Sequence, residues 1–174
     1  MTRQLKYRSK PVFWDLEDKR VISSLEVEKY RSKGRLKLPN RIERFDSTLE
    51  FSVYQKLIDL YGERRIVRQY LLMILPPGYC YPKGKYWRVD FAVKTAIGSN
   101  DYARFVEAKG AVLSDFRHTL SALENHDDRS FNRLRIVFGG GIPQDNVFIK
   151  NLLKTDFKRN LYSLRHFEKL TRLP

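Results

Sequence analysis

The chain has 174 residues, of which 42% are hydrophobic and 13% aromatic, so it is too rich in apolar side chains to be disordered and fits one folded domain. Its single cysteine excludes an internal disulfide and a multi-cysteine zinc site. The formal net charge of +14 is uneven: residues 1–45 carry a net +7, residues 46–149 only +2, and residues 150–174 a net +5. Two basic flanks around a nearly neutral centre favour a polyanionic partner such as nucleic acid.

The sequence divides into three expected segments. Residues 1–45 predict a basic N-terminal arm with one short helix over residues 23–32, and residues 150–174 predict a basic C-terminal helix or tail. The main body, residues 46–149, opens with a helix that begins at Asp46 or Ser47 and stops at Gly62. The later elements are strands over 66–74, 86–94 and 102–108, a helix over 114–125, a strand over 134–138 and a helix capped by Asp145 or Asn146.

This order of elements predicts the fold class. A helix, three strands, a helix and a strand (αβββαβ) indicate an α/β fold with a mixed four-stranded sheet flanked by helices. The late strand–helix–strand segment implies a right-handed crossover and at least one parallel pair. No run of about 18 apolar residues could span a bilayer, and the N-terminus lacks the apolar stretch of a signal peptide. We therefore expect a cytoplasmic protein with no membrane partner.

Two acids and a lysine lie on neighbouring predicted strands. Asp90 stands between Val89 and Phe91, and Glu107 and Lys109 are two residues apart in the next strand, so they point to one face of it. If that face meets Asp90, two carboxylates and an ammonium converge. Carboxylate oxygens suit Mg²⁺ or Mn²⁺, and a lysine beside them can position a water or neutralise charge on a phosphate. Charges seldom enter buried strands unpaired, so the apolar neighbours favour a site over ordinary polar positions.

Glu50 has two interpretations between which the sequence does not choose. It precedes Val53 and Leu57 at helical spacing, so it lies beside the inward stripe of its helix and could reach the same site. It also completes a capping box, in which Ser47 caps the helix and Glu50 bonds back to the Ser47 amide.

These segments together resemble the PD-(D/E)XK nuclease superfamily. The resemblance rests on Ser47-Thr-Leu-Glu50 in a helix, Asp90-Phe91 in a strand and Phe105-Val-Glu-Ala-Lys-Gly110 in the next strand. Within the superfamily the arrangement is similar to phage endonucleases of the T7 endonuclease I kind, which resolve branched DNA. Ser114-Asp-Phe-Arg117 and Arg135-Ile-Val-Phe138 extend that similarity.

The resemblance implies a restriction-endonuclease-like core that hydrolyses phosphodiester bonds in DNA with bound Mg²⁺, for which Mn²⁺ substitutes. Asp90, Glu107 and the backbone carbonyl of Ala108 would be metal ligands, and Lys109 would act on the attacking water. Glu50 would be a ligand to a second metal or an orienting residue. The DNA-binding residues are expected to be Gln69, Lys83, Lys85, Arg88 and Arg117. Lys83 and Lys85 lie in a tyrosine-rich segment that is either a contact for splayed bases or a plain surface loop.

One difference from the resolvase kind leaves two other kinds of nuclease in the superfamily as alternatives. The resolvase kind has a further glutamate between its first helix and the strand aspartate, whereas this chain has Arg68-Gln69-Tyr70 there. Gln69 followed by an aromatic residue is similar to transposon-end nucleases of the TnsA type, and phage head-completion nucleases share the same skeleton. The resolvase interpretation allows a homodimer, and the other two imply a transposition or phage partner protein.

A hypothesis of another class is a binding protein. In that case the chain would be a basic module on a nuclease fold that holds DNA without cutting it. A nuclease fold that has lost its catalytic activity usually lacks one of the acids or the lysine. In this chain Asp90, Glu107 and Lys109 are all present. The sequence therefore favours the enzyme.

Overall fold

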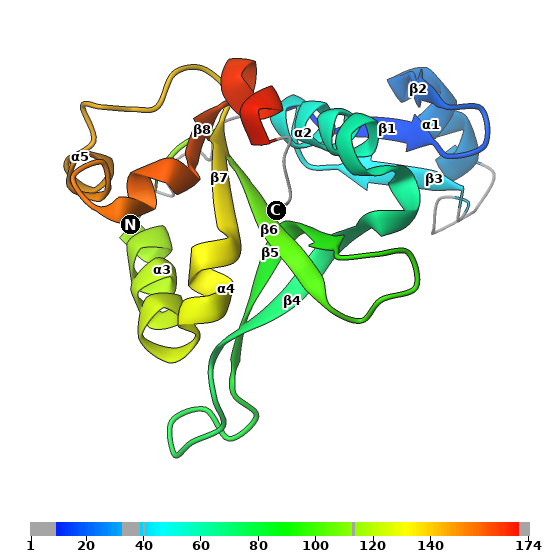
Figure 1. Ribbon diagram of the computed structural model, residues 1–174. Helices are drawn as coiled ribbons and strands as arrows, with labels where there is room; N and C mark the ends of the chain where they lie inside the picture. Colours follow the sequence, from blue (N-terminus) through cyan, green and yellow to red (C-terminus); the bar gives the residue numbers. More distant parts are fainter. Residues whose placement is uncertain (1–9, 33–38, 40, 113, 171–174) are drawn as a thin grey trace, which may run out of the picture. The chain divides into compact units, whose positions relative to one another are not determined.

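The computed structural model describes residues 10–32, 39, 41–112 and 114–170 (Figure 1). The chain forms two compact units, Met1–Ser52 and Val53–Pro174. The division falls inside the helix that the sequence assigns to the start of the main body. The segment expected to be a basic tail belongs to the second unit.

The first unit contains a three-stranded antiparallel sheet with the order β2-β1-β3. Its strands are β1 (Val12–Asp15), β2 (Arg20–Ile22) and β3 (Ile42–Phe45), and helix α1 spans Ser24–Ser32. The helix confirms the one expected over residues 23–32. The sheet was not expected, because strands of three or four residues carry too little alternation to be read from the sequence. Phe13, Ile22, Val27 and Ile42 form a cluster of buried apolar side chains in this unit.

Local side-chain hydrogen bonds define the turns of this unit. Asp15 ends β1, and its Oδ1 accepts the backbone N–H groups of Glu17 and Asp18 at 3.0 and 3.1 Å, which closes the turn into β2. At the start of α1, Ser23 Oγ accepts the Glu26 N–H at 3.3 Å while Glu26 Oε2 accepts the Ser23 N–H at 2.9 Å. This reciprocal capping box satisfies donors that would otherwise be unpaired at the helix N-terminus.

Helix α2 (Thr48–Tyr61) follows the predicted boundaries. Ser47 caps it, and Gly62 stops it with φ +78°, a left-handed value that glycine adopts without a steric penalty. A 3₁₀ turn, η1 (Glu63–Arg65), then leads into the second sheet.

The second unit is built on a five-stranded mixed sheet with the order β4-β5-β6-β7-β8. The first three strands are antiparallel to one another, and β6, β7 and β8 are parallel. The strands are β4 (Ile66–Leu75), β5 (Lys85–Lys94), β6 (Tyr102–Lys109), β7 (Leu134–Phe138) and β8 (Leu161–Ser163). The expected α/β class with a mixed sheet flanked by helices is confirmed.

The expected number of four strands is wrong for this sheet. The fifth strand, β8, has three residues and comes from the segment interpreted as a basic tail. Leu161 pairs with Ile136 and Ser163 with Phe138, so β8 extends the parallel part of the sheet. Its own sequence has no strand signal of useful length, and its conformation depends on pairing with β7.

Helices flank this sheet. Helices α3 (Ser114–His126) and α4 (Asp128–Arg133) connect β6 to β7, and this crossover accounts for the expected parallel pair. Helix α5 (Val147–Leu152) begins after Asn146, whose side chain accepts the Ile149 N–H; of the two expected caps, Asn146 is the one used. Two 3₁₀ segments, η2 (Asp156–Asn160) and η3 (Leu164–Leu170), surround β8.

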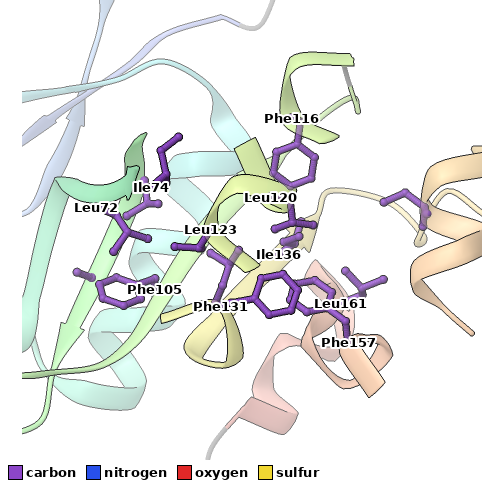
Figure 2. Close-up of a cluster of buried hydrophobic side chains, with 14 of the residues drawn as sticks. Leu72, Ile74, Phe105, Phe116, Leu120, Leu123, Phe131, Ile136, Phe157 and Leu161 are labelled. Carbon is purple, nitrogen blue, oxygen red and sulfur yellow. The ribbon is translucent and has the colours of Figure 1, made fainter. Parts of the chain in front are cut away.

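The main core of the second unit lies between the sheet and these helices (Figure 2). Phe116, Leu120 and Leu123 form the buried face of α3, as their spacing predicts. The rings of Phe131 in α4 and Phe157 in η2 stack with centroids 4.5 Å apart. Because Phe157 lies beyond residue 149, the C-terminal segment completes this core.

Candidate active site

Asp90 and Glu107 face one another across two antiparallel strands. The β5/β6 register pairs Phe91 with Val106 and Ala92 with Phe105; Asp90 precedes Phe91 and Glu107 follows Val106, at the end of this ladder. The Asp90 N–H donates to Glu107 Oε2 at 3.2 Å, and the Ala108 N–H donates to Asp90 Oδ2 at 2.8 Å. Each carboxylate is thus held by the backbone of the other's strand.

Lys109 completes the cluster on β6. Its Nζ lies 2.5 Å from Glu107 Oε1 and 4.8 Å from the centroid of the Phe116 ring in α3. The ion pair and the cation–π contact direct the ammonium toward the acids. The structure brings Asp90, Glu107 and Lys109 together, which the sequence made conditional on the Glu107 face meeting Asp90.

The cluster lies at the border between the core and solvent. Glu107 is only 4% exposed, and Asp90 and Lys109 are half-buried. Val89 and Phe91, on either side of Asp90, are fully buried, so the strand is apolar around its acid. A buried carboxylate is costly unless it has a positive or hydrogen-bonding partner, which explains why Glu107 has Lys109 on one oxygen and an N–H group on the other.

The oxygen donors of this cluster suit a hard divalent cation. Within the described ranges, no group of three or more His, Cys, Asp or Glu side chains is placed to hold a metal ion. The cluster instead has the carboxylates of Asp90 and Glu107, with the Ala108 carbonyl between Glu107 and Lys109 in the chain. Oxygen-only sets fit Mg²⁺ or Mn²⁺, which keep several waters as ligands. A carboxylate has about four acceptor positions, so hydrogen bonds from the protein are compatible with a bound cation.

Gln69 lies in β4, the strand that pairs with β5 on the side away from β6. The β4/β5 register pairs Arg68 with Phe91 and Tyr70 with Val89, so Gln69 corresponds to Asp90. Gln69 has φ +51° inside a strand, a left-handed conformation that costs a non-glycine residue about 1–3 kcal/mol.

This backbone conformation changes which side chains of β4 reach the core. Val67 and Tyr70 both pack against the main core, although they are three residues apart and regular alternation would place them on opposite faces. Such strain is concentrated at functional sites. The sequence has no signal for it, because glutamine shows no preference for positive φ that would mark the position.

The expected DNA-binding cations lie on two elements of the second unit. Lys83 precedes β5, Lys85 begins it, and Arg88 is two residues from Asp90; all three are exposed. Arg117 is exposed on α3, next to the Phe116 ring that contacts Lys109. Arg88 and Arg117 thus belong to the two elements that frame the acids.

Glu50 acts as the capping residue of α2. Its backbone N–H donates to Ser47 Oγ at 3.0 Å, and its Oε2 accepts the Asp46 N–H at 2.8 Å. The bond back therefore goes to Asp46 rather than to the expected Ser47 amide. Glu50 belongs to the first unit and the acid cluster to the second, and a metal-binding role for Glu50 stays a prediction.

Searches of protein-family models, curated proteins and solved structures find no significant match to this chain. The resemblance to the PD-(D/E)XK nucleases therefore stays a prediction from the residues quoted above. No helix in the described part of the chain combines the length and the apolar composition needed to cross a membrane.

Proposed function

We propose that this chain is a Mg²⁺-dependent DNA endonuclease whose active site is formed by Asp90, Glu107 and Lys109. The observation that supports it most is the reciprocal hydrogen bonding of Asp90 and Glu107 across β5 and β6, with Lys109 paired to Glu107. A restriction-endonuclease-like core is part of the proposal. Its support is the element order, in which three antiparallel strands are followed by a helix and a strand parallel to the third.

The two acids are held by backbone hydrogen bonds in positions that suit metal binding. Asp90 Oδ2 is fixed by the Ala108 N–H and Glu107 Oε2 by the Asp90 N–H, so neither carboxylate needs to reorganise to face the other. Preorganised groups stabilise developing charge because they do not have to be reoriented during the reaction. A bound Mg²⁺ would polarise a phosphate oxygen and lower the pKa of a bound water.

Lys109 supplies the positive group of the proposed site. The Glu107 carboxylate and the Phe116 ring hold its ammonium at the end of β6. From that position it would hold the attacking water by a hydrogen bond or neutralise charge that develops on the phosphate. Glu107 therefore has two roles in the proposal, as a metal ligand and as the group that orients Lys109.

DNA is the substrate that the charge distribution favours. The net charge of +14 produces a positive potential that attracts polyanions and raises their rate of association. Arg88 and Arg117 lie on elements next to the acids, where they would bind phosphates on either side of the cut.

A cutting assay on the full chain tests this proposal. The substrates are linear duplex, single-stranded and four-way junction DNA, each with Mg²⁺, Mn²⁺ or EDTA. We expect cutting with either metal and none in EDTA, and we expect Lys109→Ala to lower the rate at least about a hundredfold. Lys94→Ala is the matched control, because Lys94 is also a half-buried lysine at the end of a strand, four residues from Asp90 in β5.

The outcomes separate the alternatives. A preference for the junction would favour the resolvase kind, and cutting of linear duplex alone would favour the other kinds. Cutting that persists in Lys109→Ala at the rate of Lys94→Ala would contradict the proposed site. Salt-sensitive DNA binding without cutting in either metal would overturn the stand-alone enzyme and leave a partner-activated nuclease or a DNA-holding protein.

A further inference from the structure

The outer half of the β4–β5 hairpin is a strongly basic projection of the second unit. Residues 70–89 contain three Lys or Arg residues and no Asp or Glu, although acids make up 20 of the chain's 174 residues. The hairpin extends past α3 and α4, away from the rest of its sheet (Figure 1). Its end therefore faces solvent and is free of nearby negative charge on its own strands.

Exposed apolar side chains are concentrated on the same hairpin. Of the nine large hydrophobic residues that are exposed in the described ranges, five lie between residues 71 and 86. Tyr79 is fully exposed, and Tyr81 and Tyr86 are exposed by 43% and 47%. A contiguous group of exposed aromatic side chains marks an interaction surface rather than a chance distribution.

The strand register places part of this exposed surface on one face of the hairpin, and we call the exposed surface the strip. Leu71 is paired with Arg88, and Met73 with Tyr86; residues directly opposite each other share a face of the sheet. The left-handed backbone at Gln69 interrupts the alternation of β4 beyond this point. The strip therefore extends from the hairpin end as far as the Leu71–Arg88 pair.

The opposite face of the hairpin is fixed to the core. Leu72 and Ile74 are 5% and 1% exposed, and the Trp87 ring lies 5.9 Å from the Phe116 ring in an edge-to-face contact. The strands that carry the strip are therefore fixed by packing on their opposite face. A binding surface on a fixed backbone loses less conformational entropy when a ligand binds.

The loop at the hairpin end is ordered by its own contacts. The backbones of Gly78 and Tyr81 exchange two hydrogen bonds of 2.9 and 3.1 Å, and the Gly84 N–H donates to Tyr81 at 2.8 Å. Gly84 has φ +77°, and a Cβ at this position would lie 2.9 Å from the Leu75 carbonyl oxygen, so only glycine fits. Lys85 Nζ lies 5.6 Å from the Tyr81 ring centroid, which places a cation beside an aromatic face.

We propose that this strip, formed by Tyr79, Tyr81, Tyr86, Lys83 and Arg88, binds unpaired bases of the DNA substrate. The inference rests on the proposed nuclease function and specifies its substrate as DNA with a splayed or single-stranded arm. Tyrosine rings stack on unpaired bases of any sequence, and the neighbouring cations bind the phosphates between them. A fully paired duplex offers phosphates to the cations but no base faces to the tyrosines.

Charge complementarity selects DNA over the other partners of an exposed aromatic surface. The strip has cations alone, which matches the uniform negative charge of a nucleic-acid backbone. An anionic lipid surface is also polyanionic and is included in the test as a competing outcome.

The test measures binding of the full chain carrying Lys109→Ala, in EDTA, so that no cutting occurs. The probes are fluorescein-labelled blunt duplex, a forked duplex of the same sequence with two unpaired arms, and vesicles of anionic phospholipid. We expect the fork to bind at least about tenfold more tightly than the blunt duplex. Tyr79→Ala and Tyr86→Ala should each lower the affinity for the fork about tenfold and leave blunt-duplex affinity unchanged.

Two controls separate stacking from folding and from general hydrophobicity. Tyr79→Phe and Tyr86→Phe keep the ring and should retain the preference for the fork. Ile97→Ala removes an apolar side chain that is 67% exposed outside the hairpin, and it should change neither affinity. Equal binding of fork and blunt duplex would overturn the inference. It would also be overturned if the tyrosine-to-alanine variants lost affinity for fork and blunt duplex equally, or lost affinity for vesicles alone. Because this assay measures binding alone, a failure of the nuclease proposal would be seen in the cutting assay and would not change the binding result.

Discussion

The carboxylate of Glu107 lies between a backbone donor and a cation: its Oε2 accepts the Asp90 N–H at 3.2 Å, and its Oε1 lies 2.5 Å from Lys109 Nζ. Asp90 is held in the same way by the Ala108 N–H. A single pair of antiparallel strands thus fixes three ionisable groups with few degrees of freedom. Substitutions at these residues should change chemistry more than folding, because Asp90 and Lys109 are only half-buried and stay partly solvated.

Glu107→Gln should abolish metal-dependent cutting while the protein stays folded. The amide keeps the shape of the side chain but removes the negative charge that a divalent cation requires, so we expect a loss of at least about a hundredfold. Lys109 is 23% exposed and can be solvated when it loses its partner. The measurements are the cutting rate, Mn²⁺ binding by calorimetry and the thermal unfolding midpoint. Unchanged Mn²⁺ binding in Glu107→Gln would contradict its role as a ligand.

The left-handed backbone at Gln69 predicts an unusual response to substitution. Gln69→Val should destabilise the protein by about 1–3 kcal/mol, because a β-branched residue is strained at φ +51°. Gln69→Gly should be nearly neutral, since relief of strain offsets the greater entropy of the unfolded chain. Urea unfolding measures both. Leu71→Val is the matched control in the same strand, where Leu71 is exposed and valine favours the extended conformation. Equal effects of Gln69→Val and Leu71→Val would contradict the assigned backbone strain.

The first unit should lose stability in acid as Glu26 becomes protonated. Hydrogen bonds from the Arg20 guanidinium and from Ser23 lower the pKa of Glu26 from 4.5 to about 2. A carboxyl with a lowered pKa in the folded state contributes stability that is fully present above its unfolded pKa and is lost as pH falls through its folded pKa. Between pH 4.5 and about 2 the wild type should therefore lose this contribution, and Glu26→Gln should show a smaller pH dependence.

The fluorescence of Trp14 in β1, in a Trp87→Phe background, follows acid unfolding of the first unit. Glu28→Gln is the control, because Glu28 is an exposed glutamate on the same helix. If Glu26→Gln and Glu28→Gln have the same pH profile, the contacts of Glu26 with Arg20 and Ser23 do not stabilise this unit.

The C-terminal segment should be essential for folding of the second unit. Phe157 is 6% exposed and stacks on Phe131, so Phe157→Ala should lower the free energy of unfolding by about 3–5 kcal/mol through lost burial and a cavity. Removal of residues 150–174 should leave β7 unpaired on one side and prevent stable folding. Val147→Ala, at a position 73% exposed, is the control for denaturant unfolding and should change little. A truncated chain as stable as the full one would show that β8 and Phe157 are dispensable.

Much of the second unit could be predicted from local pattern. The helix stop at Gly62, the three strands around Asp90 and Glu107, and the buried face of α3 follow from glycine position and from apolar periods of two and 3.6 residues. The antiparallel pairing of the two strands is expected from the short turn between them, whereas the meeting of Asp90 with Glu107 also requires the right register. These features depend on residues close in the sequence.

Other features depend on contacts between distant segments. Strand β8 is too short to form without β7, the sheet of the first unit has strands of only three or four residues, and the positive φ of Gln69 is sustained by the pairing of β4 with β5. Local propensity determined the elements that carry the acids and the lysine. Only tertiary packing decided the fifth strand, the hydrogen bonds that lock Asp90 against Glu107, and the strained position beside them, because each requires a partner strand already in place.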